Sequence, residues 1–419
     1  MSKLKVALLG FGTVGSGVYE AVKTHQQRLE TLLGKPVEVA AVLIKDEQKK
    51  RNVDSNVLFT SNIEKVLETP GLNVVMEAIV GVEPGYTYLS KAMEKGCHIV
   101  TANKELFAHK GIELKKKARE NNVNILFEAA VAGGIPIIGT LRKLLQVNDV
   151  SKVTGILNGT SNYILSDIRT RQIPFSRALE AAQQKGYAEA DPVNDVEGWD
   201  AFYKLMILSE LLYGVQPEWT ETTRKGIRDV SFGDICIAEA FGLRIKHIAT
   251  VERSLEGLKA RVEPVMMAPS HPLYSIEGVD NAVTVTGDLV GEVTLTGPGA
   301  GAKPTASAMV EDLLHVQDSN HPFVHEKIKG ENQESTLKDD NRLQDWLLVV
   351  PSINLPDDVV VHEAKTLTVN GKSVTGYYVS GSVATVNRLL KQYSTLVVYP
   401  VEGEGLRFES KELVIVNTR

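Results

Sequence analysis

The chain has 419 residues, enough for two or three domains that each bury an apolar core. A formal net charge of −6, without long runs of Lys or Arg, excludes the basic surface typical of nucleic-acid binding, so we expect a small-molecule partner. The two cysteines, Cys97 and Cys236, are too far apart in sequence for a disulfide framework or a metal knuckle, which favours buried thiols in a reducing compartment.

Residues 1–130 are predicted to form a dinucleotide-binding domain. The first residues, MSKLKVALLG, enter a strand directly, so we expect no leader peptide, no membrane partner and a cytoplasmic location. Strand-like runs such as VEVAAVLI and VVMEAI then alternate with helical stretches such as KGIELKKKARENN. This alternation is typical of βαβ units that wind a parallel sheet, and the predicted fold class is therefore α/β of the Rossmann type.

A glycine pattern follows the first strand. Gly10, Gly12 and Gly15 form G-x-G-x-x-G between this strand and a helix. Gly10 would allow a tight turn, Gly12 would let the backbone approach a pyrophosphate, and Gly15 would allow close packing of helix on strand. An ordinary glycine-rich turn is the alternative, but the flanking strand and helix favour dinucleotide binding, with the helix N-terminus donating to the anion.

The end of the second strand bears on the choice of dinucleotide. VEVAAVLI ends at Ile44 and is followed by Lys45, with more basic residues at 49–51. An acid at this place binds the ribose 2′-OH of NAD, whereas a basic residue accommodates the 2′-phosphate of NADP. Lys45 favours NADP, while Asp46 keeps NAD possible and a solvated helix start would also explain the basic residues.

The remaining chain is predicted to hold two further domains. Residues 131–295 mix helices with alternating strands and indicate an α+β substrate-binding and dimerisation domain, whose apolar strands favour a homodimer or a higher homo-oligomer. Residues 296–316 offer a glycine-rich turn and a helix that returns to the first domain. Residues 317–341 are polar and predict a linker. Residues 342–419 predict a small α+β domain with a helix at VATVNRLLKQYS and a hairpin turn at VNGKSV.

The segment GYAEADPVNDVEGWDAFYKL, residues 186–205, collects carboxylates just before an apolar helix. If the helix begins near Asp195 or Val196, Asp200 and Lys204 lie one turn apart on one face, and the following LMILSELLYG predicts burial with Gly214 as the C-cap. A buried Asp and Lys must be paired or face a polar cavity. A structural ion pair is one interpretation. The additional acids upstream favour recognition of a cationic ligand, with the lysine left for proton transfer.

The spacing A-x3-G-Y-A-E-A-D-P-x2-D-V-x-G-x-D-x3-K, from Ala182 to Lys204, resembles the signature of the homoserine dehydrogenases. TANKELFAHKG, FEAAVAGGIPII, NGTSNYIL and GPGAGAKPTASA agree with that family in the same order, so the resemblance covers roughly residues 1–320. It implies reversible NAD(P)-dependent interconversion of L-aspartate 4-semialdehyde and L-homoserine, on the route to threonine, methionine and isoleucine. A nucleotide-sensing regulator without catalysis, and a dehydrogenase of another amino-acid semialdehyde, are the alternatives.

The resemblance implies roles for single residues. Lys204 matches the proton donor, and Lys104 matches a second catalytic residue between cofactor and substrate, although a surface lysine at a strand end is the simpler interpretation of Lys104. Either lysine would need desolvation or a nearby cation to act as an acid at pH 7. Glu189 and Asp200 would bind the substrate ammonium, and Asn158, Gly159 and Thr160 would either contact the substrate or merely cap a helix. The expected cofactor residues are Gly10, Phe11, Gly12, Thr13, Val14, Gly15, Lys45, Lys104, Gly186 and Gly301.

Two further features follow from the resemblance. A sodium ion would be bound by Glu128 and by the backbone carbonyls of Val131, Gly133 and Ile135, since hard oxygen ligands suit such an ion. A glycine-rich turn explains the same residues without a metal. Many family members end in a regulatory βαββαβ module of the ACT type. The tail departs from that pattern because DWLLVVPSINLPDDVVVHEA lacks the expected turn and a convincing first helix, so we expect a divergent ACT-like domain.

Overall fold

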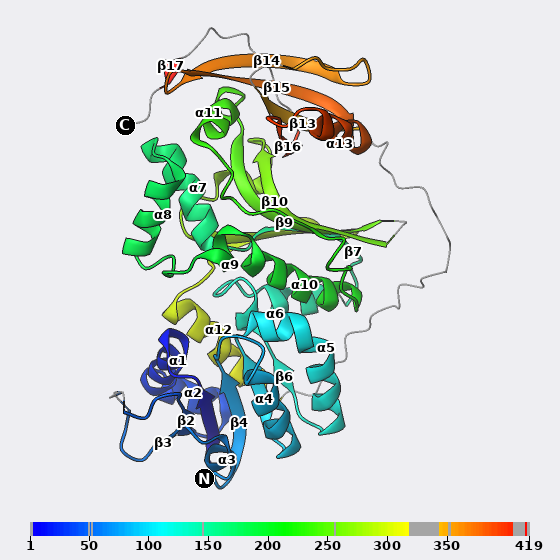
Figure 1. Ribbon diagram of the computed structural model, residues 1–419. Coiled ribbons are helices and arrows are strands. Elements are labelled where there is room, and N and C mark those ends of the chain that lie inside the picture. The colour runs from blue at the N-terminus through cyan, green and yellow to red at the C-terminus, as the bar shows by residue number, and fades with distance from the viewer. Residues whose placement is uncertain are drawn as a thin grey trace. The chain divides into compact units, whose positions relative to one another are not determined.

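The computed structural model describes residues 3–48, 51, 53–144, 146–254, 257–317, 343–350, 353–404 and 415–416 (Figure 1). They divide into two compact units. Unit 1 comprises the described residues of 1–149, 203–216 and 295–326, and unit 2 comprises those of 150–202, 217–294 and 327–419. Within these ranges no helix has the length and apolar character needed to span a membrane. Apart from Gln317, the predicted linker lies outside the described residues.

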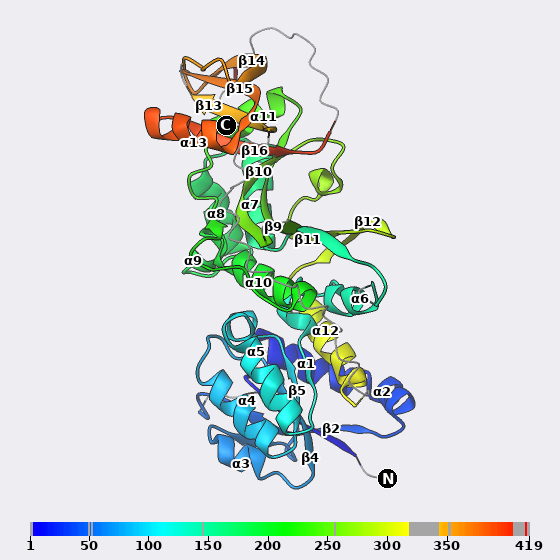
Figure 2. The ribbon, with the colours of Figure 1, turned by 90° about the vertical axis from the view of Figure 1, so that its right-hand side faces the viewer.

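Unit 1 is built on a six-stranded parallel sheet in the order β3-β2-β1-β4-β5-β6. Its central strands are almost continuously apolar because helices cover both faces. Helices α1, α2 and α12 lie on one face and α4 and α5 on the other (Figure 2). The predicted Rossmann-type parallel sheet is confirmed, since this strand order is that of dinucleotide-binding folds. The strands are β1 (Leu4–Leu9), β2 (Val37–Leu43), β3 (Leu58–Thr60), β4 (Leu72–Glu77), β5 (His98–Thr101) and β6 (Ile125–Leu126).

The helices of unit 1 include one from late in the chain. Helix α12 packs on α1 so closely that a Cβ added at Gly17 would lie 2.8 Å from the carbonyl oxygen of Ala302. Apolar side chains of both helices share one core with the sheet. The helices are α1 (Thr13–Thr24), α2 (Gln26–Leu33), α3 (Ile63–Leu67), α4 (Gly85–Glu94), α5 (Lys104–Glu120), α6 (Ile137–Leu144), α12 (Ala302–His315) and the 3-10 helix Glu128–Ala130. Helix α10 (Trp199–Tyr213) begins in unit 2 and continues in unit 1.

Unit 2 contains a mixed sheet in the order β12-β11-β7-β9-β10-β16-β13-β15-β14-β17, with β8 paired to β10. Its first part is antiparallel, and α7 and α11 pack against it. The elements of this part are β7 (Val150–Ile156), α7 (Gly159–Arg171), α8 (Phe175–Gln184), α9 (Val193–Val196), β8 (Thr223–Arg224), α11 (Phe232–Ala240), β9 (Arg244–Ser254), β10 (Gly257–Met267), the 3-10 helix Pro272–Ser275, β11 (Asp280–Gly287) and β12 (Gly291–Pro298).

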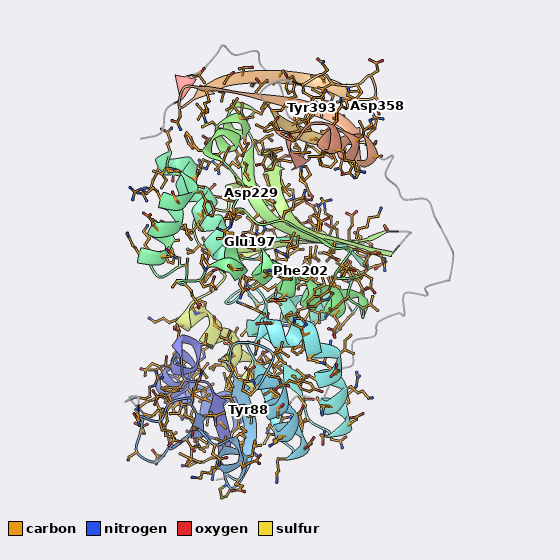
Figure 3. All side chains as sticks on the ribbon, in the orientation of Figure 1. Tyr88, Glu197, Phe202, Asp229, Asp358 and Tyr393 are labelled. Atoms are coloured by element: carbon orange, nitrogen blue, oxygen red, sulfur yellow. The ribbon has the colours of Figure 1, made fainter. Side chains whose placement is uncertain are left out.

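The described residues of the C-terminal module, 343–350 and 353–404, have the strand order β16-β13-β15-β14 and one helix, α13. A loop at 353–359 stands where a βαββαβ module has its first helix. Asp358 in this loop accepts hydrogen bonds from Thr385 Oγ1 (2.6 Å) and Arg388 Nη2 (2.8 Å), and the Tyr393 hydroxyl donates to the Asn354 carbonyl (3.2 Å; Figure 3). The elements are β13 (Leu343–Val350), β14 (Val360–Val369), β15 (Lys372–Ser382), α13 (Val383–Gln392), β16 (Val397–Glu402) and β17 (Ile415–Val416). The predicted hairpin turn and tail helix are confirmed.

The C-terminal module continues the sheet and the core of the preceding residues. Strand β16 pairs in parallel with β10, which places Glu402 opposite Met267. The Glu402 carboxylate is paired with Lys152 Nζ (3.1 Å) and with Arg261. Helix α11 packs on β15 so tightly that a Cβ at Gly376 would lie 2.3 Å from Ile237 Cγ2. The module and the first part of unit 2 therefore share both backbone hydrogen bonds and apolar packing.

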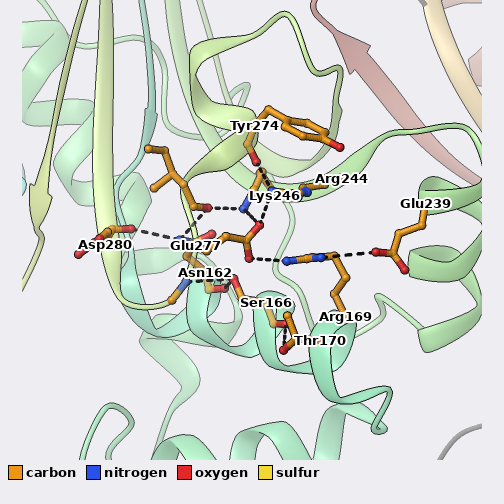
Figure 4. A network of polar contacts seen from close by, with 12 residues as sticks. Asn162, Ser166, Arg169, Thr170, Glu239, Arg244, Lys246, Tyr274, Glu277 and Asp280 are labelled. Carbon is orange, nitrogen blue, oxygen red and sulfur yellow. Dashed lines mark hydrogen bonds and ion pairs between the residues drawn. The ribbon is translucent and has the colours of Figure 1, made fainter.

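A buried lysine in unit 2 depends on one shared carboxylate. Lys246 on β9 is only 2% exposed, and its ammonium donates to Glu277 (3.0 Å) and to the Ile276 carbonyl. Arg244 and Arg169 also contact the Glu277 carboxylate, at 3.0 and 3.2 Å (Figure 4). Burial lowers the pKa of Lys246 to about 8, against the opposing attraction of Glu277. Glu277 therefore compensates a cluster of cations that would be costly to bury alone.

Candidate functional site

The glycine turn lies at the carboxyl end of β1. Gly10 has φ +93°, and a Cβ there would lie 2.8 Å from the carbonyl oxygen of Ala78. A Cβ at Gly15 would lie 2.0 Å from the carbonyl oxygen of Gly10, so only glycine lets α1 approach the turn. Nothing lies within 4 Å of the corresponding position at Gly12. The turn thus packs closely at its first and third glycines and is open at the second, as dinucleotide binding requires.

The other predicted residues of this turn differ in what they can offer a ligand. Phe11 is 7% exposed and packs edge-on against Tyr19 and Phe59, so its side chain belongs to the core and only its backbone can serve the cofactor. Thr13 is exposed, and Val14 packs partly into the core. Helix α1 has no side-chain cap at Gly12, which leaves the amides of its first turn available to an anion.

The end of β2 borders the same turn, because the Gly10 amide donates to the Leu43 carbonyl at 3.0 Å. Lys45 is exposed just beyond this strand. The neighbouring acids have local partners: Asp46 accepts from the Gln48 amide (2.9 Å), and Glu47 accepts from Ser61 Oγ (2.8 Å). Lys45 is therefore the first exposed charged side chain after β2, and it is basic.

Lys104 begins helix α5 directly after β5, and its side chain is exposed. Asn103 caps this helix by accepting from the Leu106 amide at 3.0 Å. Sequence reasoning missed the residue that holds Asn103, which is Glu77 at the end of β4. The Glu77 carboxylate is fully buried and accepts from Thr101 Oγ1 (2.6 Å), the Ile79 amide (2.7 Å) and Asn103 Nδ2 (3.2 Å). A lone acid inside the apolar run VVMEAI was the available signal.

In unit 2, Asn158 joins the acids of the opening segment. Its Nδ2 donates to Asp195 Oδ1 (2.7 Å) and to Asp200 Oδ2 (2.9 Å). Its Oδ1 accepts from the Ser161 amide (2.7 Å) and so caps α7. Asn158 therefore serves as the predicted helix cap and also holds two carboxylates together at the start of that helix.

The predicted helix around Lys204 has a break that the sequence analysis did not anticipate. Instead of one helix from Asp195 or Val196, α9 ends at Val196 and α10 begins at Trp199. Gly198 between them has φ +81°, and a Cβ there would lie 3.1 Å from Cε1 of the buried His247, so the chain turns where only glycine fits. Asp200 and Lys204 still lie one turn apart on α10. Both are buried, at 3% and 7% exposure, and Gly214 ends the helix as predicted.

The loop 186–191 is more open than α10. Glu189 is exposed, and its carbonyl accepts from Gln183 Nε2 at 3.1 Å. Thr160 Oγ1 donates to the Tyr187 carbonyl (2.6 Å), which ties this loop to the start of α7 next to Gly159. Gly186 is exposed in the same loop, whereas Gly301 lies in unit 1 as the N-cap of α12. In unit 2 the structure therefore brings Asn158, Thr160 and Asp200 to one end of α7.

Glu128 is buried beside a second acid, Asp312, which is partly buried. Its carboxylate oxygens accept from the Ile138 and Gly139 amides (2.8 and 2.7 Å), and its own amide donates to Asp312 (2.8 Å). Burial raises the pKa of Glu128 and raises that of Asp312 to about 7. The Ile135 carbonyl accepts from the Ile137 amide, and Gly133 has φ +54° in a tight turn with Val131. Among the described residues, His, Cys, Asp and Glu nowhere gather in a group of three that could hold a metal.

The region of the glycine turn and the region that contains Lys204 each match a protein-family model. The model "Homoserine dehydrogenase, NAD binding domain" matches residues 10–128, and the model "Homoserine dehydrogenase" matches residues 136–314. The chain belongs to the homoserine dehydrogenase family. The homoserine dehydrogenase of Bacillus subtilis is 41% identical over 317 residues, 75% of this chain and 73% of that protein. That of Synechocystis is 42% identical over 318 residues, with the same shares.

Solved homoserine dehydrogenase structures extend the likeness to the C-terminal module. The crystal structure from Thiobacillus denitrificans has a TM-score of 0.85 at 31% identity and covers 96% of this chain and 98% of its own. The S. aureus structure at pH 6.5 has a TM-score of 0.78 at 32% identity, with 96% and 99% covered. A hyperthermophilic archaeal homoserine dehydrogenase in complex with NADPH has a TM-score of 0.64 at 28% identity, with 75% and 98% covered.

The prediction of a homoserine dehydrogenase is thus confirmed. The protein is an oxidoreductase that uses a nicotinamide cofactor and acts on a small-molecule substrate. Its activity interconverts L-aspartate 4-semialdehyde and L-homoserine.

The Asn158 bridge predicts the effect of two substitutions in this homoserine dehydrogenase. Asn158→Asp keeps an acceptor for the Ser161 amide but places a third carboxylate against Asp195 and Asp200. We expect a loss of about 2–4 kcal/mol in the free energy of unfolding at pH 8, measured by urea denaturation. Like charges raise the folded-state pKa values of acids, so stability is lost as pH rises, and the deficit should shrink at pH 5. Asn158→Ser, which keeps the cap without added charge, should show no such recovery; equal pH trends would contradict the bridge.

Proposed function

We propose that Lys204 is the proton donor of the reaction and that Asp200 and Glu189 bind the amino group of the substrate. The observation that carries this proposal is the position of Asp200 and Lys204, both buried and one turn apart on α10. When bound, the reduced nicotinamide would supply a hydride for the aldehyde carbon. The Lys204 ammonium protonates the carbonyl oxygen, and in the reverse direction the neutral amine removes the hydroxyl proton.

Substrate binding is assigned to the residues at the start of α7. Asp200 and Glu189 provide two carboxylates, which suit the ammonium group of an amino acid. Asn158 holds Asp200 in place, and Gly159 and Thr160 present the first amides of α7, whose N-terminus favours the substrate carboxylate. Lys104, exposed at the start of α5, is assigned to the cofactor side, where its charge polarises the carbonyl.

The assignment of Lys204 predicts a specific kinetic defect. Lys204→Ala should lower kcat about 10²- to 10⁴-fold, the usual effect of losing a general acid, while the Kd for the cofactor stays within about twofold. The rate at which NADPH absorbance is lost gives kcat, and quenching of cofactor fluorescence gives the Kd. Lys185→Ala, at an exposed lysine beyond α8, is the control and should leave both unchanged. Near-normal kcat in Lys204→Ala would remove Lys204 from the mechanism.

NADP is the proposed cofactor. Its support is the exposed Lys45 beyond β2, next to an Asp46 that is already bonded to the Gln48 amide. The archaeal relative solved with NADPH agrees with this choice. The glycine turn and the uncapped start of α1 would bind the pyrophosphate, and Gly186 and Gly301 are assigned to the nicotinamide end.

Lys45→Glu tests this preference by reversing the charge that would meet the 2′-phosphate. We expect the KM for NADPH to rise about tenfold or more, because a charge-assisted contact is replaced by repulsion. The KM for NADH should change less than about threefold, since NADH lacks the phosphate. Initial rates with both cofactors measure the two values. A parallel change in both would indicate that Lys45 does not read the phosphate.

A sodium ion is proposed near Glu128. Glu128 is buried and Asp312 is partly buried, and Arg142 is the cation that opposes them, which leaves one negative charge uncompensated when both acids are ionised. A monovalent cation held by the Glu128 carboxylate and by the carbonyls of Val131, Gly133 and Ile135 would restore neutrality. Oxygen ligands of this kind suit sodium, and the tight turn at 131–135 can direct its carbonyls inward.

The cation proposal predicts a salt effect on stability that one substitution removes. Replacing choline chloride with sodium chloride at constant ionic strength should raise the melting temperature, because the folded state alone binds the ion. Glu128→Gln should lose this response, whereas Glu120→Gln, at an exposed position on α5, should keep it. Thermal unfolding followed by circular dichroism measures both. An equal sodium response in the two variants would contradict the assignment.

The remaining assignments concern biological context. We infer that the C-terminal module is ACT-like, supported by its strand order β16-β13-β15-β14 and its single helix. A homodimer is supported by the exposed Leu289 and Val290 at the β11–β12 turn, and light scattering that gives one chain mass would contradict it. The free, buried Cys97 and Cys236 suit the cytoplasm. We infer that the enzyme acts on the route to threonine, methionine and isoleucine.

A further inference from the structure

Glu77 is a buried acid, and the described residues place no cation against its carboxylate. Its three donors are the Thr101 hydroxyl, the Asn103 amide group and the Ile79 backbone amide. The fourth neighbour is Gly85 of α4, where an added Cβ would lie 3.6 Å from Glu77 Oε1. Burying a carboxylate is costly, and a smaller apolar residue would close β4 at no such cost. We therefore attribute the presence of the carboxylate to the three donors that it holds in place.

The Glu77 cluster, which comprises Glu77, Ile79, Thr101 and Asn103, joins two loops at the carboxyl edge of the sheet. Glu77 pairs with Thr101 in the register of β4 and β5. Thr101 Oγ1 accepts from the Asn103 amide (3.0 Å), and Asn103 Nδ2 also donates to the Gly81 carbonyl (2.8 Å). The loop after β4 and the loop after β5 are thus fixed to one buried carboxylate.

Both loops border groups assigned to the reaction. Ala78 follows Glu77 directly, and its carbonyl oxygen would lie 2.8 Å from a Cβ added at Gly10 of the glycine turn. Asn103 caps α5, and Lys104 is the first residue of that helix. Asn103 directly precedes Lys104 in the chain. A change at Glu77 can therefore shift Lys104 through Asn103, and Glu77 does not need to contact a ligand.

We propose that Glu77 is a positioning residue for the dehydrogenase reaction, and that its ionised carboxylate sets the start of α5, and hence Lys104, through Thr101 and Asn103. This inference rests on the role of Lys104 given under Proposed function. Only the ionised group accepts from all three donors, because protonation turns one carboxylate oxygen into a donor that then competes with the amides and the hydroxyl.

The proposal has a consequence for pH. Burial raises the pKa of Glu77 to about 7, against the three hydrogen bonds, and no charged side chain of the described residues is among the causes. Because the folded pKa lies above the unfolded value, Glu77 contributes stability that is present below the unfolded pKa and is lost as pH rises through about 7. Activity should follow the opposite trend, since the positioning contacts need the ionised form. Between pH 5.5 and 8.5, therefore, the stability should fall while the activity rises.

The test is the pH profile of kcat/KM for aspartate semialdehyde with NADPH, from pH 5.5 to 9. The wild-type enzyme should show an acid limb near pH 7. Glu77→Gln should remove this limb and lower kcat/KM about 10- to 100-fold at pH 8, the size expected when a reacting group is displaced. Its melting temperature at pH 8 should be equal or higher, because a buried charge is gone. A Glu77→Gln profile with the wild-type limb would overturn the proposal.

A second variant keeps the test valid if Glu77→Gln does not fold. Thr101→Val removes the shortest hydrogen bond to the carboxylate, so the acid limb should move to higher pH, while Thr101→Ser should restore the wild-type profile. An unmoved limb in Thr101→Val would also overturn the proposal.

The double variant Glu77→Gln, Lys104→Ala separates the positioning role from the role of Lys104. If Glu77 acts through Lys104, the double variant should be no slower than Lys104→Ala alone. Multiplied defects would show that Glu77 acts elsewhere and would overturn this inference. Normal turnover of Lys104→Ala by itself would instead refute the assignment of Lys104, and with it the route from Glu77 to the chemistry.

Discussion

Burial of carboxylates against neutral donors is the constraint on which this structure depends. Asp200 is held by the amide of Asn158, Glu128 by two backbone amides, and Glu77 by a hydroxyl and two amides. Such donors satisfy an acid without cancelling its charge. Each site therefore keeps negative charge in a place from which water is largely excluded, where a cation or a proton is bound more strongly than at the surface.

The contrast with Glu277 shows how the chain separates stability from function. Three cations converge on Glu277, so its charge is used within the fold and little remains for a ligand. The hydrogen-bond donors to Glu77, in contrast, are neutral. The difference lies in partner type rather than in burial, and it distinguishes a structural carboxylate from one that can hold an ammonium group or a proton.

Much of this arrangement could be predicted from the sequence, because short-range patterns carry it. The glycine motif after an apolar strand, the apolar helix behind Asp200 and the Asn-Gly hairpin each depend on residues within about fifteen positions. The break at Gly198 was not predicted, and His247, the side chain that a Cβ at Gly198 would crowd, is distant in sequence. Glu77 and Thr101 meet only through strand pairing, and the double role of Asn158 depends on Asp195 and Asp200 returning to it. Contacts of this kind leave no local pattern.

The shared sheet of unit 2 bears on how the C-terminal module evolves and how it can be engineered. The curated relatives align over 75% of the chain, whereas the bacterial crystal structures cover 96% of it. The structural likeness thus extends over more of the chain than the sequence likeness does. Strand β16 pairs with β10 and helix α11 packs against β15, so the module shares an interface with the rest of unit 2. A chimera that exchanges the C-terminal module between homologues would also have to exchange Met267, Arg261 and the face of α11 that packs on β15. The segment to be exchanged is therefore larger than the module itself.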